Sequence, residues 1–394
     1  MRSPRHLSAA LRHGAVGALA SLALIAGVTA AGASAPPRPA APDREAASLP
    51  IAQRWSAVLH GGFVRAANTA VTCRRALTPK VPSCAEAAAT GGQGRGAAPL
   101  VANGDYSLFY ADADRDPNTY NSTRARLRVP EGARIRYARL YWGGNLRVGE
   151  QKPPKDNARV LFAEPGGAYR ELRADTVTGH RVAGGADAFQ SSADVTRSVR
   201  AGGPGLYTVA QINVARGNSP TGGWGGWTLV AAYERGSEPL RRLSLWDGFR
   251  TLHADERDRR SLSVGLPALR VPAGARGSAG IVAYDGDRGL DGDSVTVRTG
   301  NAPAVPLGDA ANPTADVFNS TVSEGGRERA GDRVPGPPHT FGYDSDVLDL
   351  TRALRPGGTG LQVRVTAQRD SLWLGALFLQ TDAESRTGGG GSAD

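Results

Sequence analysis

Short runs of β-type residues, separated by turn-forming residues, limit the folds open to this chain. From Gly61 onward the runs are rich in β-branched and aromatic residues, as in residues 135–142 and 227–233, and Gly, Pro, Asn or Asp stands between them. The sequence has 52 Gly and 26 Pro, and no amphipathic helical pattern exceeds two turns. Many short strands between such turns are typical of sandwiches. The sequence therefore predicts an all-β fold, an antiparallel β-sandwich.

An internal repeat predicts that the sandwich consists of two related jelly-roll-like units, residues 61–240 and 241–383. Three sequence blocks recur in the same order, and the longest is identical at eight of thirteen positions. Self-similarity in register is the signature of a duplicated unit. The matching blocks are 194–206 with 349–361, 129–134 with 271–276, and 156–160 with 293–297.

The longest block predicts the same local structure in both copies. Asp194 and Asp349 each begin a segment that predicts a one-turn helix capped by the carboxylate, and Gly-Gly ends it in a left-handed turn before a strand. Because these two launching segments have the same turn-forming residues, we expect the strands that follow them to take equivalent positions in the fold. We therefore expect residues 135–142 to superpose on 278–285, Leu206 to match Leu361, and Trp227 to match Trp373 or its neighbour.

The first residues predict export. Three arginines precede an apolar run over residues 14–31, which ends in Ala31-Gly32-Ala33, the small-residue form of a signal-peptidase site. We expect residues 1–33 to be a signal peptide, 34–60 an Ala/Pro-rich leader, and 384–394 a flexible Gly-rich tail. An uncleaved anchor is the alternative, because the run is near the lower length limit for a membrane span. No other segment has the apolar pattern of a membrane span, so the sequence predicts a secreted protein.

The basic composition does not indicate a nucleic-acid surface. The formal net charge is +10, but only three of the 47 cationic residues are lysine, and the arginines are spread among acidic residues. Nucleic-acid binding needs clustered cations with stacking aromatics. The two cysteines, Cys73 and Cys84, are close in sequence, and in an exported chain they predict a disulfide.

Two acidic loops are candidate calcium sites. They bring oxygen ligands of the kind that hard cations prefer. Pro117 and the lack of a Glu at the twelfth position exclude an EF-hand in the first loop. The alternative is ordinary turn chemistry, since Asp and Asn cap turns without an ion. The candidates are Asp112, Asp114, Asp116 and Asn118 in the first loop, and Asp285, Asp287, Asp291 and Asp293 in the second.

Tryptophan is the remaining candidate for ligand binding. Trp224 stands among glycines, and Trp227 begins a predicted strand. An exposed Trp can stack on a sugar ring or anchor a partner. Trp224 could equally fold over the end of the sandwich as a plug. Trp142, Trp246 and Trp373 fall inside predicted strands, and we expect them in the core.

A search for catalytic motifs is negative. The histidines of the mature part are scattered singly, and neither a Gly-x-Ser-x-Gly nor a His-Glu-x-x-His motif is present. Gly292-Asp293-Ser294 is similar to the opening of one esterase family, but the matching repeat block has Asn157 in place of Ser294. The sequence therefore predicts no enzyme.

Several motifs give the mature chain a wider resemblance. It resembles the N-terminal extracellular β-module of large bacterial surface proteins that carry tandem immunoglobulin-like repeats, and each half resembles galactose-binding-like jelly rolls. The resemblance implies an extracellular β-module and no activity at named residues. The matching motifs include Leu140-Tyr141-Trp142-Gly143, Trp246-Asp247-Gly248-Phe249, Ala283-Tyr284-Asp285-Gly286-Asp287 and Phe318-Asn319-Ser320-Thr321.

Together these observations favour a secreted, non-catalytic binding or adhesion module for an envelope or extracellular glycan, with calcium as the candidate cofactor. A structural matrix or assembly protein is the alternative. A hydrolase with an unrecognised site is the third reading.

Overall fold

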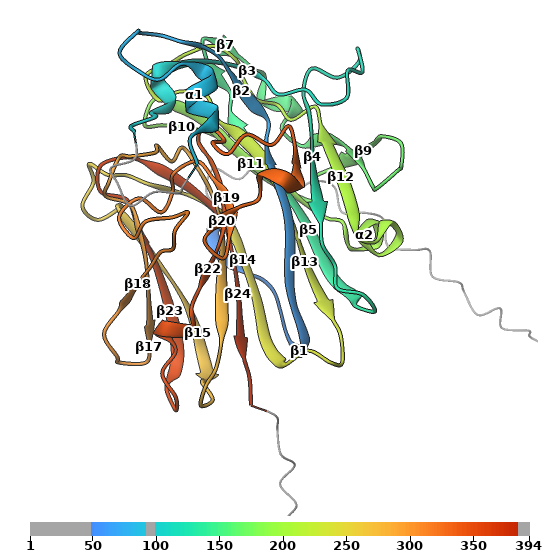
Figure 1. The fold of residues 1–394 in the computed structure, drawn as a ribbon, viewed down its shortest axis with the longest axis vertical. Coiled ribbons are helices and arrows are strands. Elements are labelled where there is room, and N and C mark those ends of the chain that lie inside the picture. The colour runs from blue at the N-terminus through green and yellow to red at the C-terminus, as the bar shows by residue number, and fades with distance from the viewer. Residues whose placement is uncertain (1–48, 92–98, 385–394) are drawn as a thin grey trace, which may run out of the picture. The chain divides into compact units, whose positions relative to one another are not determined.

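A computed structural model describes residues 49–91 and 99–384 of the chain. Twenty-four strands and a few short helices make this part all-β, which confirms the predicted fold class (Figure 1). The predicted signal peptide, residues 34–48 of the leader and nearly all of the predicted tail lie outside the described residues. No helix within the described ranges is long and apolar enough to cross a membrane.

The largest sheet has eleven strands, and its neighbours run antiparallel except for the parallel pair β22 and β19. In sheet order the strands are β10 (Thr176–Ala183), β11 (Ala186–Asp194), β5 (Arg134–Asn145), β13 (Gly225–Glu234), β1 (Leu49–Thr69), β14 (Leu240–Leu252), β24 (Leu372–Asp382), β16 (Gly277–Tyr284), β22 (Tyr343–Asp349), β19 (Val322–Glu324) and β20 (Arg327–Glu328).

Strand β1 joins the two halves of this sheet. Its residues 61–69 pair with β13, and its residues 49–60 pair with β14 (Figure 1). The change of partner falls at Gly61, where a Cβ would lie 1.9 Å from the carbonyl oxygen of Tyr233, so only glycine fits. The expected leader over 34–60 is therefore wrong for residues 49–60, whose backbone groups bond to β14.

Two smaller sheets each cover one half of the large sheet. The first buries Trp142, Trp227 and Tyr207 in its core, and the second buries Ile281 and Leu377. The first sheet contains β21 (Arg333–Val334), β4 (Ser122–Leu127), β12 (Gly205–Ala210), β8 (Arg159–Ala163) and β9 (Arg170–Arg173), and the second contains β15 (Ser261–Arg270), β23 (Thr359–Thr366), β17 (Ser294–Thr299) and β18 (Val305–Leu307).

Short elements complete the described structure. Two-stranded sheets and single turns of helix connect the main strands. They are β2 (Val71–Ala76) with β3 (Tyr106–Tyr110), β6 (Arg147–Val148) with β7 (Glu150–Gln151), the helices α1 (Cys84–Ala89) and α2 (Thr196–Gly202), and the 3-10 turns η1 (Asn103–Asp105), η2 (Pro154–Asp156), η3 (Ala330–Asp332) and η4 (Thr351–Ala353).

The free faces of the two halves of the large sheet pack against each other. Gln190 of β11 donates to the carbonyl oxygens of Gly248 in β14 and Gly375 in β24, although several strands separate β11 from both in the sheet. A shared apolar cluster includes Tyr141 from one half and Phe249 from the other. The large sheet therefore doubles back around β1, and side chains from both halves meet between the layers.

The two halves follow the same strand order. In the large sheet β1-β13-β5-β11 corresponds to β14-β24-β16-β22, and in the smaller sheets β4-β12-β8-β9 corresponds to β15-β23-β17-β18. The two launching segments also begin alike, since Asp194 and Asp349 each accept a hydrogen bond from the backbone amide two residues later, at 2.8 Å. Each aspartate stands one residue before the N-cap position, which is Val195 in α2 and Leu350 in η4. The origin of the halves by duplication stays a prediction.

The expected match of Leu206 with Leu361 is wrong by one position. Leu361 is buried in the second core, whereas Leu206 is only half-buried and Tyr207 takes the inward place. The launching segment is an α-helix of seven residues in α2 but a 3-10 turn of three in η4, and a slip of one residue turns a strand's side chains to the other face. Trp373 faces the layer between the halves, so its neighbour Leu374 is the inward counterpart of Trp227.

The predicted disulfide is confirmed: Cys73 of β2 is bonded to Cys84 at the start of α1. It closes a short loop, with a sequence separation of 11. We expect the Cys73→Ala/Cys84→Ala double variant to lose about 2–3 kcal/mol of unfolding free energy, because an open loop gives the unfolded chain more freedom. Urea denaturation measures this loss. A midpoint equal to that of the unaltered protein would show that the bond adds nothing to stability.

Candidate functional site

The structure decides between the two alternatives for Trp224 in favour of burial, so the candidate ligand-binding role of Trp224 and Trp227 is wrong. Trp224 and Trp227 are both 0% exposed, so neither can stack on a sugar from solvent. Trp224 packs against Tyr284 and Trp373, with ring centroids 5.6 and 6.2 Å away. The glycines beside Trp224 let other backbone segments approach it, and this is why it is buried. Trp142, Trp246 and Trp373 lie in the core as predicted.

The first acidic loop satisfies its own polar groups. An oxygen of Asp114 accepts from the amide of Asp116 at 2.9 Å, and an oxygen of Asp116 accepts from the amide of Asn118 at 2.9 Å. Asp112 accepts from the Ser122 hydroxyl at 2.7 Å. These are the bonds of Asx turns, in which Asp and Asn side chains cap their own backbone.

The second acidic loop does not bring its four carboxylates to one point. Asp287 accepts from the amide of Asn103 at 2.7 Å, and Asp293 accepts from the amides of Val317 and Phe318. Asp291 is exposed. Across residues 49–91 and 99–384, no group of three His, Cys, Asp or Glu side chains is arranged to hold a metal ion.

Calcium binding at these loops stays a prediction. If Asp285 or Asp287 holds calcium, millimolar calcium will raise the melting temperature above its value in chelator, because a ligand that binds only the folded state stabilises it. The Asp287→Asn variant should then lose the increase. Identical melting curves with calcium and with chelator would contradict the prediction.

A cavity of about 200 Å³ opens where β1, β10, β11 and β14 meet, and we call it the interlayer pocket. Both halves of the large sheet contribute to its walls, so the pocket exists only because the sheet doubles back. Its lining residues are Pro50, Ala52, Gln53, Arg54, Thr176, Thr178, Gln190, Ser192, Asp247 and Gly248.

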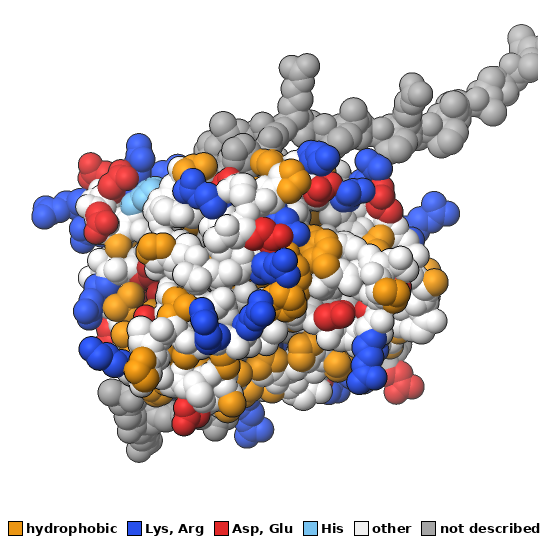
Figure 2. All heavy atoms as spheres, turned by 90° about the horizontal axis from the view of Figure 1, so that it is seen from above, with side chains coloured by type: hydrophobic (Ala, Val, Ile, Leu, Met, Phe, Trp, Pro, Cys, Tyr) orange, Lys and Arg blue, Asp and Glu red, His pale blue; other side chains and the backbone are white. Residues whose placement is uncertain are grey.

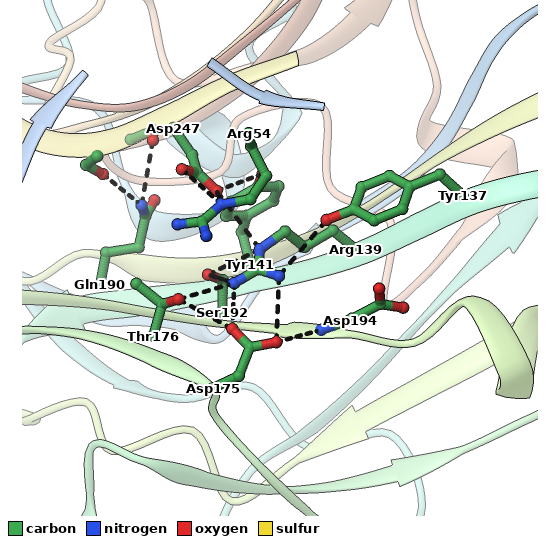
Figure 3. A network of polar contacts seen from close by, with 12 residues as sticks. Arg54, Tyr137, Arg139, Tyr141, Asp175, Thr176, Gln190, Ser192, Asp194 and Asp247 are labelled. Carbon is green, nitrogen blue, oxygen red and sulfur yellow. Dashed lines mark hydrogen bonds and ion pairs between the residues drawn. The ribbon is translucent and has the colours of Figure 1, made fainter. Parts of the chain in front are cut away.

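Asp247 is the polar centre of the pocket. It is only 6% exposed, and Nε of Arg54 donates to its two carboxylate oxygens at 3.0 and 2.9 Å (Figure 3). The Tyr141 hydroxyl donates to the same carboxylate at 3.0 Å, and Nε of Arg139 lies 3.4 Å from it. A buried carboxylate needs such partners, since an unpaired charge costs several kcal/mol.

Arg139 does not line the pocket but lies next to Asp247, and it links this carboxylate to Asp175 and Ser192. Its guanidinium donates to both oxygens of Asp175 and, at 3.0 and 2.9 Å, to the hydroxyl of Ser192 (Figure 3). Its side chain is 3% exposed. Two arginines and two aspartates therefore balance each other's charge around the pocket.

The network keeps its charges fixed near neutral pH. Burial acts to raise the pKa of Asp175, but the hydrogen bonds and charge of Arg139 outweigh it and hold that pKa below its usual range. Burial acts to lower the pKa of Arg139, yet its partners raise it further above neutrality. Burial and the Asp247 charge raise the pKa of Tyr141 well above its usual value. These three groups are therefore suited to binding and positioning rather than to proton transfer.

Arg54 offers the pocket its free donors. Its Nε is engaged by Asp247, whereas Nη1 and Nη2 make no hydrogen bond among the described residues. The Arg54 side chain is 34% exposed, so a ligand can reach it. Hydroxyls of Thr176, Thr178 and Ser192 line the wall that β10 and β11 form. The Thr176 hydroxyl already accepts from Arg139 at 3.0 Å and donates to Asp175 at 2.9 Å. The pocket therefore offers planar donors from Arg54 and the hydroxyls of Thr178 and Ser192.

Sequence reasoning missed this site because its residues are far apart in the chain and belong to no known motif. One signal was available. Arg139 and Asp247 interrupt runs of apolar strand residues, at positions where a sandwich core or layer admits a charge only with a partner. Two opposite charges in such positions could have indicated a buried pair.

A second group of buried carboxylates gives a testable pH dependence. Burial raises the pKa of Asp346 and of Asp370 to about 7, and that of Asp316 to about 6. The folded protein thus retains protons that the unfolded chain releases above about pH 4. The free energy of unfolding should therefore fall as pH rises from about 4 to about 7.

We expect a higher urea midpoint at pH 5 than at pH 8, and a smaller difference between the two in the Asp346→Asn variant. The window avoids more acidic pH, where the lowered pKa values of Asp114 and Asp175 act in the opposite direction. A midpoint that is equal or higher at pH 8 would show that these carboxyls are ionised in the folded state.

No protein-family model and no curated protein matches this chain. Solved structures give only faint similarity. One from Sulfolobus Turreted Icosahedral Virus has a TM-score of 0.22 and 10% identity, over 66% of this chain and 86% of that one. PNGase F, a glycosylasparaginase from Flavobacterium meningosepticum, has a TM-score of 0.17 and 12% identity, over 70% of this chain and 93% of that one. Quercetin 2,3-dioxygenase from Acinetobacter baumannii has a TM-score of 0.17 and 11% identity, over 83% of this chain and 87% of that one. At such TM-scores none of the three supports an inference about this chain.

Proposed function

We propose that this chain is a secreted, non-catalytic binding protein that holds an envelope or extracellular glycan in the interlayer pocket. The observation that carries the proposal is an accessible cavity lined by Arg54 donors and by the hydroxyls of Thr178 and Ser192. Sugars present alternating donors and acceptors, and sites for small ligands orient them with a few well-placed polar groups. The Cys73–Cys84 bond and the predicted signal peptide support export.

The size and charge of the pocket narrow the ligand. About 200 Å³ is below the roughly 300–1,000 Å³ of sites for drug-sized molecules, so the pocket suits one sugar residue, such as a chain end or branch. The charges of Arg54 and Arg139 are already balanced by Asp247 and Asp175. A neutral residue therefore needs no further counter-ion there. The resemblance to surface-protein modules is compatible with this role and stays a prediction.

A glycan array tests the proposal with a variant that blocks the pocket. Ala52 is exposed and lines the pocket, so Ala52→Trp should fill it without touching the charged network. Val58 is 50% exposed on the same strand outside the pocket, and Val58→Trp is the matched control. We expect saccharide binding by the unaltered protein and Val58→Trp, and loss of binding in Ala52→Trp.

If the unaltered protein binds no saccharide on the array, the result would contradict the proposal. It would favour the structural alternative, in which the charged network only fastens the two halves together. Binding that survives Ala52→Trp would place the glycan elsewhere on the protein.

A further inference from the structure

Five arginines line a second, smaller cavity of about 130 Å³, which we call the arginine pocket. It lies between β1, β4, β19 and the segment from β20 to β21, and it shares no residue with the interlayer pocket. Two acidic residues, Glu324 and Asp332, also line it. The arginines are Arg65, Arg126, Arg128, Arg329 and Arg333.

Two of these arginines, the buried Arg333 and the half-buried Arg65, have no carboxylate partner among the described residues. Arg333 is 4% exposed, and its Nη1 donates to the side-chain oxygen of Asn68 at 3.3 Å. Arg65 donates to the carbonyl oxygen of Ser323. Nε of both Arg333 and Arg65 is buried without a hydrogen-bond partner in the described structure. Neither arginine forms an ion pair among the described residues, so the carboxylates beside the cavity do not neutralise these two charges directly.

The acidic residues of the pocket pair with its other arginines. Asp332 is held by the guanidinium of Arg128, and Glu324 pairs with Arg329 at 3.1 Å. Burial, and then the positive charge of Arg65, lower the pKa of Arg333 to about 10, and Glu328 and Asp346 compensate only in part. The lining thus carries five positive and two negative charges, and a bound anion would relieve the repulsion.

We propose that the arginine pocket binds a tetrahedral oxyanion, sulfate or phosphate, either free or as an ester on a saccharide. Guanidinium groups present fixed forks of donors that match oxyanions, and they bind them more strongly than neutral groups do. The small volume admits one such group.

The test uses thermal shift and calorimetry with sodium sulfate and sodium phosphate, against sodium chloride at equal ionic strength, because general screening acts on every surface charge. We expect saturable heat with sulfate or phosphate and none with chloride, and a rise in melting temperature that levels off at the same anion concentration, whereas general stabilisation by excluded anions keeps rising with concentration. Equal behaviour in the three salts would overturn the proposal.

Two surface variants place the site without disturbing buried arginines. Arg329→Ala removes a donor and leaves Glu324 unopposed, so it should weaken oxyanion binding about tenfold or more. Glu324→Gln removes a negative charge from the lining and should tighten binding, a gain that misfolding cannot produce. Arg257→Ala and Glu256→Gln are exposed controls away from the pocket and should change nothing. Unchanged affinity in both pocket variants would show that the ion binds elsewhere.

Comparison of an inorganic anion with a sulfated or phosphorylated monosaccharide distinguishes a free ion from an ester as the ligand. A free ion as ligand predicts that inorganic sulfate or phosphate binds at least as tightly as a sulfated or phosphorylated monosaccharide. An ester ligand predicts tighter binding of the monosaccharide and competition by the inorganic ion. Either result is independent of the proposed glycan site, since Ala52→Trp should leave the arginine pocket intact.

Discussion

Replacing Arg139 with methionine is expected to lower the free energy of unfolding by about 3–5 kcal/mol. Methionine fills similar space but leaves the buried Asp247 carboxylate with Arg54 and Tyr141 alone, and it removes the donors to Ser192 and Asp175. Breaking one side of a buried ion network costs more than the network contributes, because an uncompensated charge remains. Urea or guanidinium denaturation measures the loss.

The matched control lies three residues away on the same strand. Arg136 pairs with Glu234 at 3.2 Å, but its side chain is 53% exposed, and surface pairs contribute about 0–1 kcal/mol. Arg136→Met should therefore change stability little. Equal losses in Arg136→Met and Arg139→Met, or none in either, would mean that the network does not hold the layers together.

Truncating Trp224 to alanine is expected to cost about 3–5 kcal/mol of unfolding free energy. The side chain is fully buried and contacts the rings of Tyr284 and Trp373 between the layers, so its removal leaves a large cavity. Thermal or chemical denaturation of the variant measures the cost.

Trp55 provides the comparison for this truncation. It is half-buried and stacks on Tyr137 with ring centroids 5.4 Å apart, so Trp55→Ala should cost clearly less. A Trp224→Ala variant as stable as the unaltered protein would indicate that Trp224 is exposed in solution, which is the other alternative that its glycine neighbours left open.

The sequence was informative where local chemistry determines the structure. Alternating strands and glycine-rich turns predicted the all-β sandwich, and Asp194 and Asp349 each accept from the amide at the start of the helical turn that follows. The spacing of Cys73 and Cys84 predicted their bond. These features depend on residues that are close in the sequence, so a single chain reveals them.

Features that depend on packing between distant segments were not predictable in this way. Residues 49–60 form a strand only because β14 offers its edge, and Leu206 turns outward because α2 and η4 differ in length. Trp224 is buried by segments far along the chain. The interlayer pocket depends on the doubling back of the large sheet around Gly61, which no residue pattern encodes by itself.

A crystal structure with the saccharide that binds most tightly on the array, at saturating concentration, tests the central claim most directly. We predict ordered density for one sugar residue in the interlayer pocket, within hydrogen-bond distance of the Arg54 guanidinium and facing the Thr178 wall. A saccharide ordered at another surface, with the interlayer pocket empty at saturation, would contradict the account.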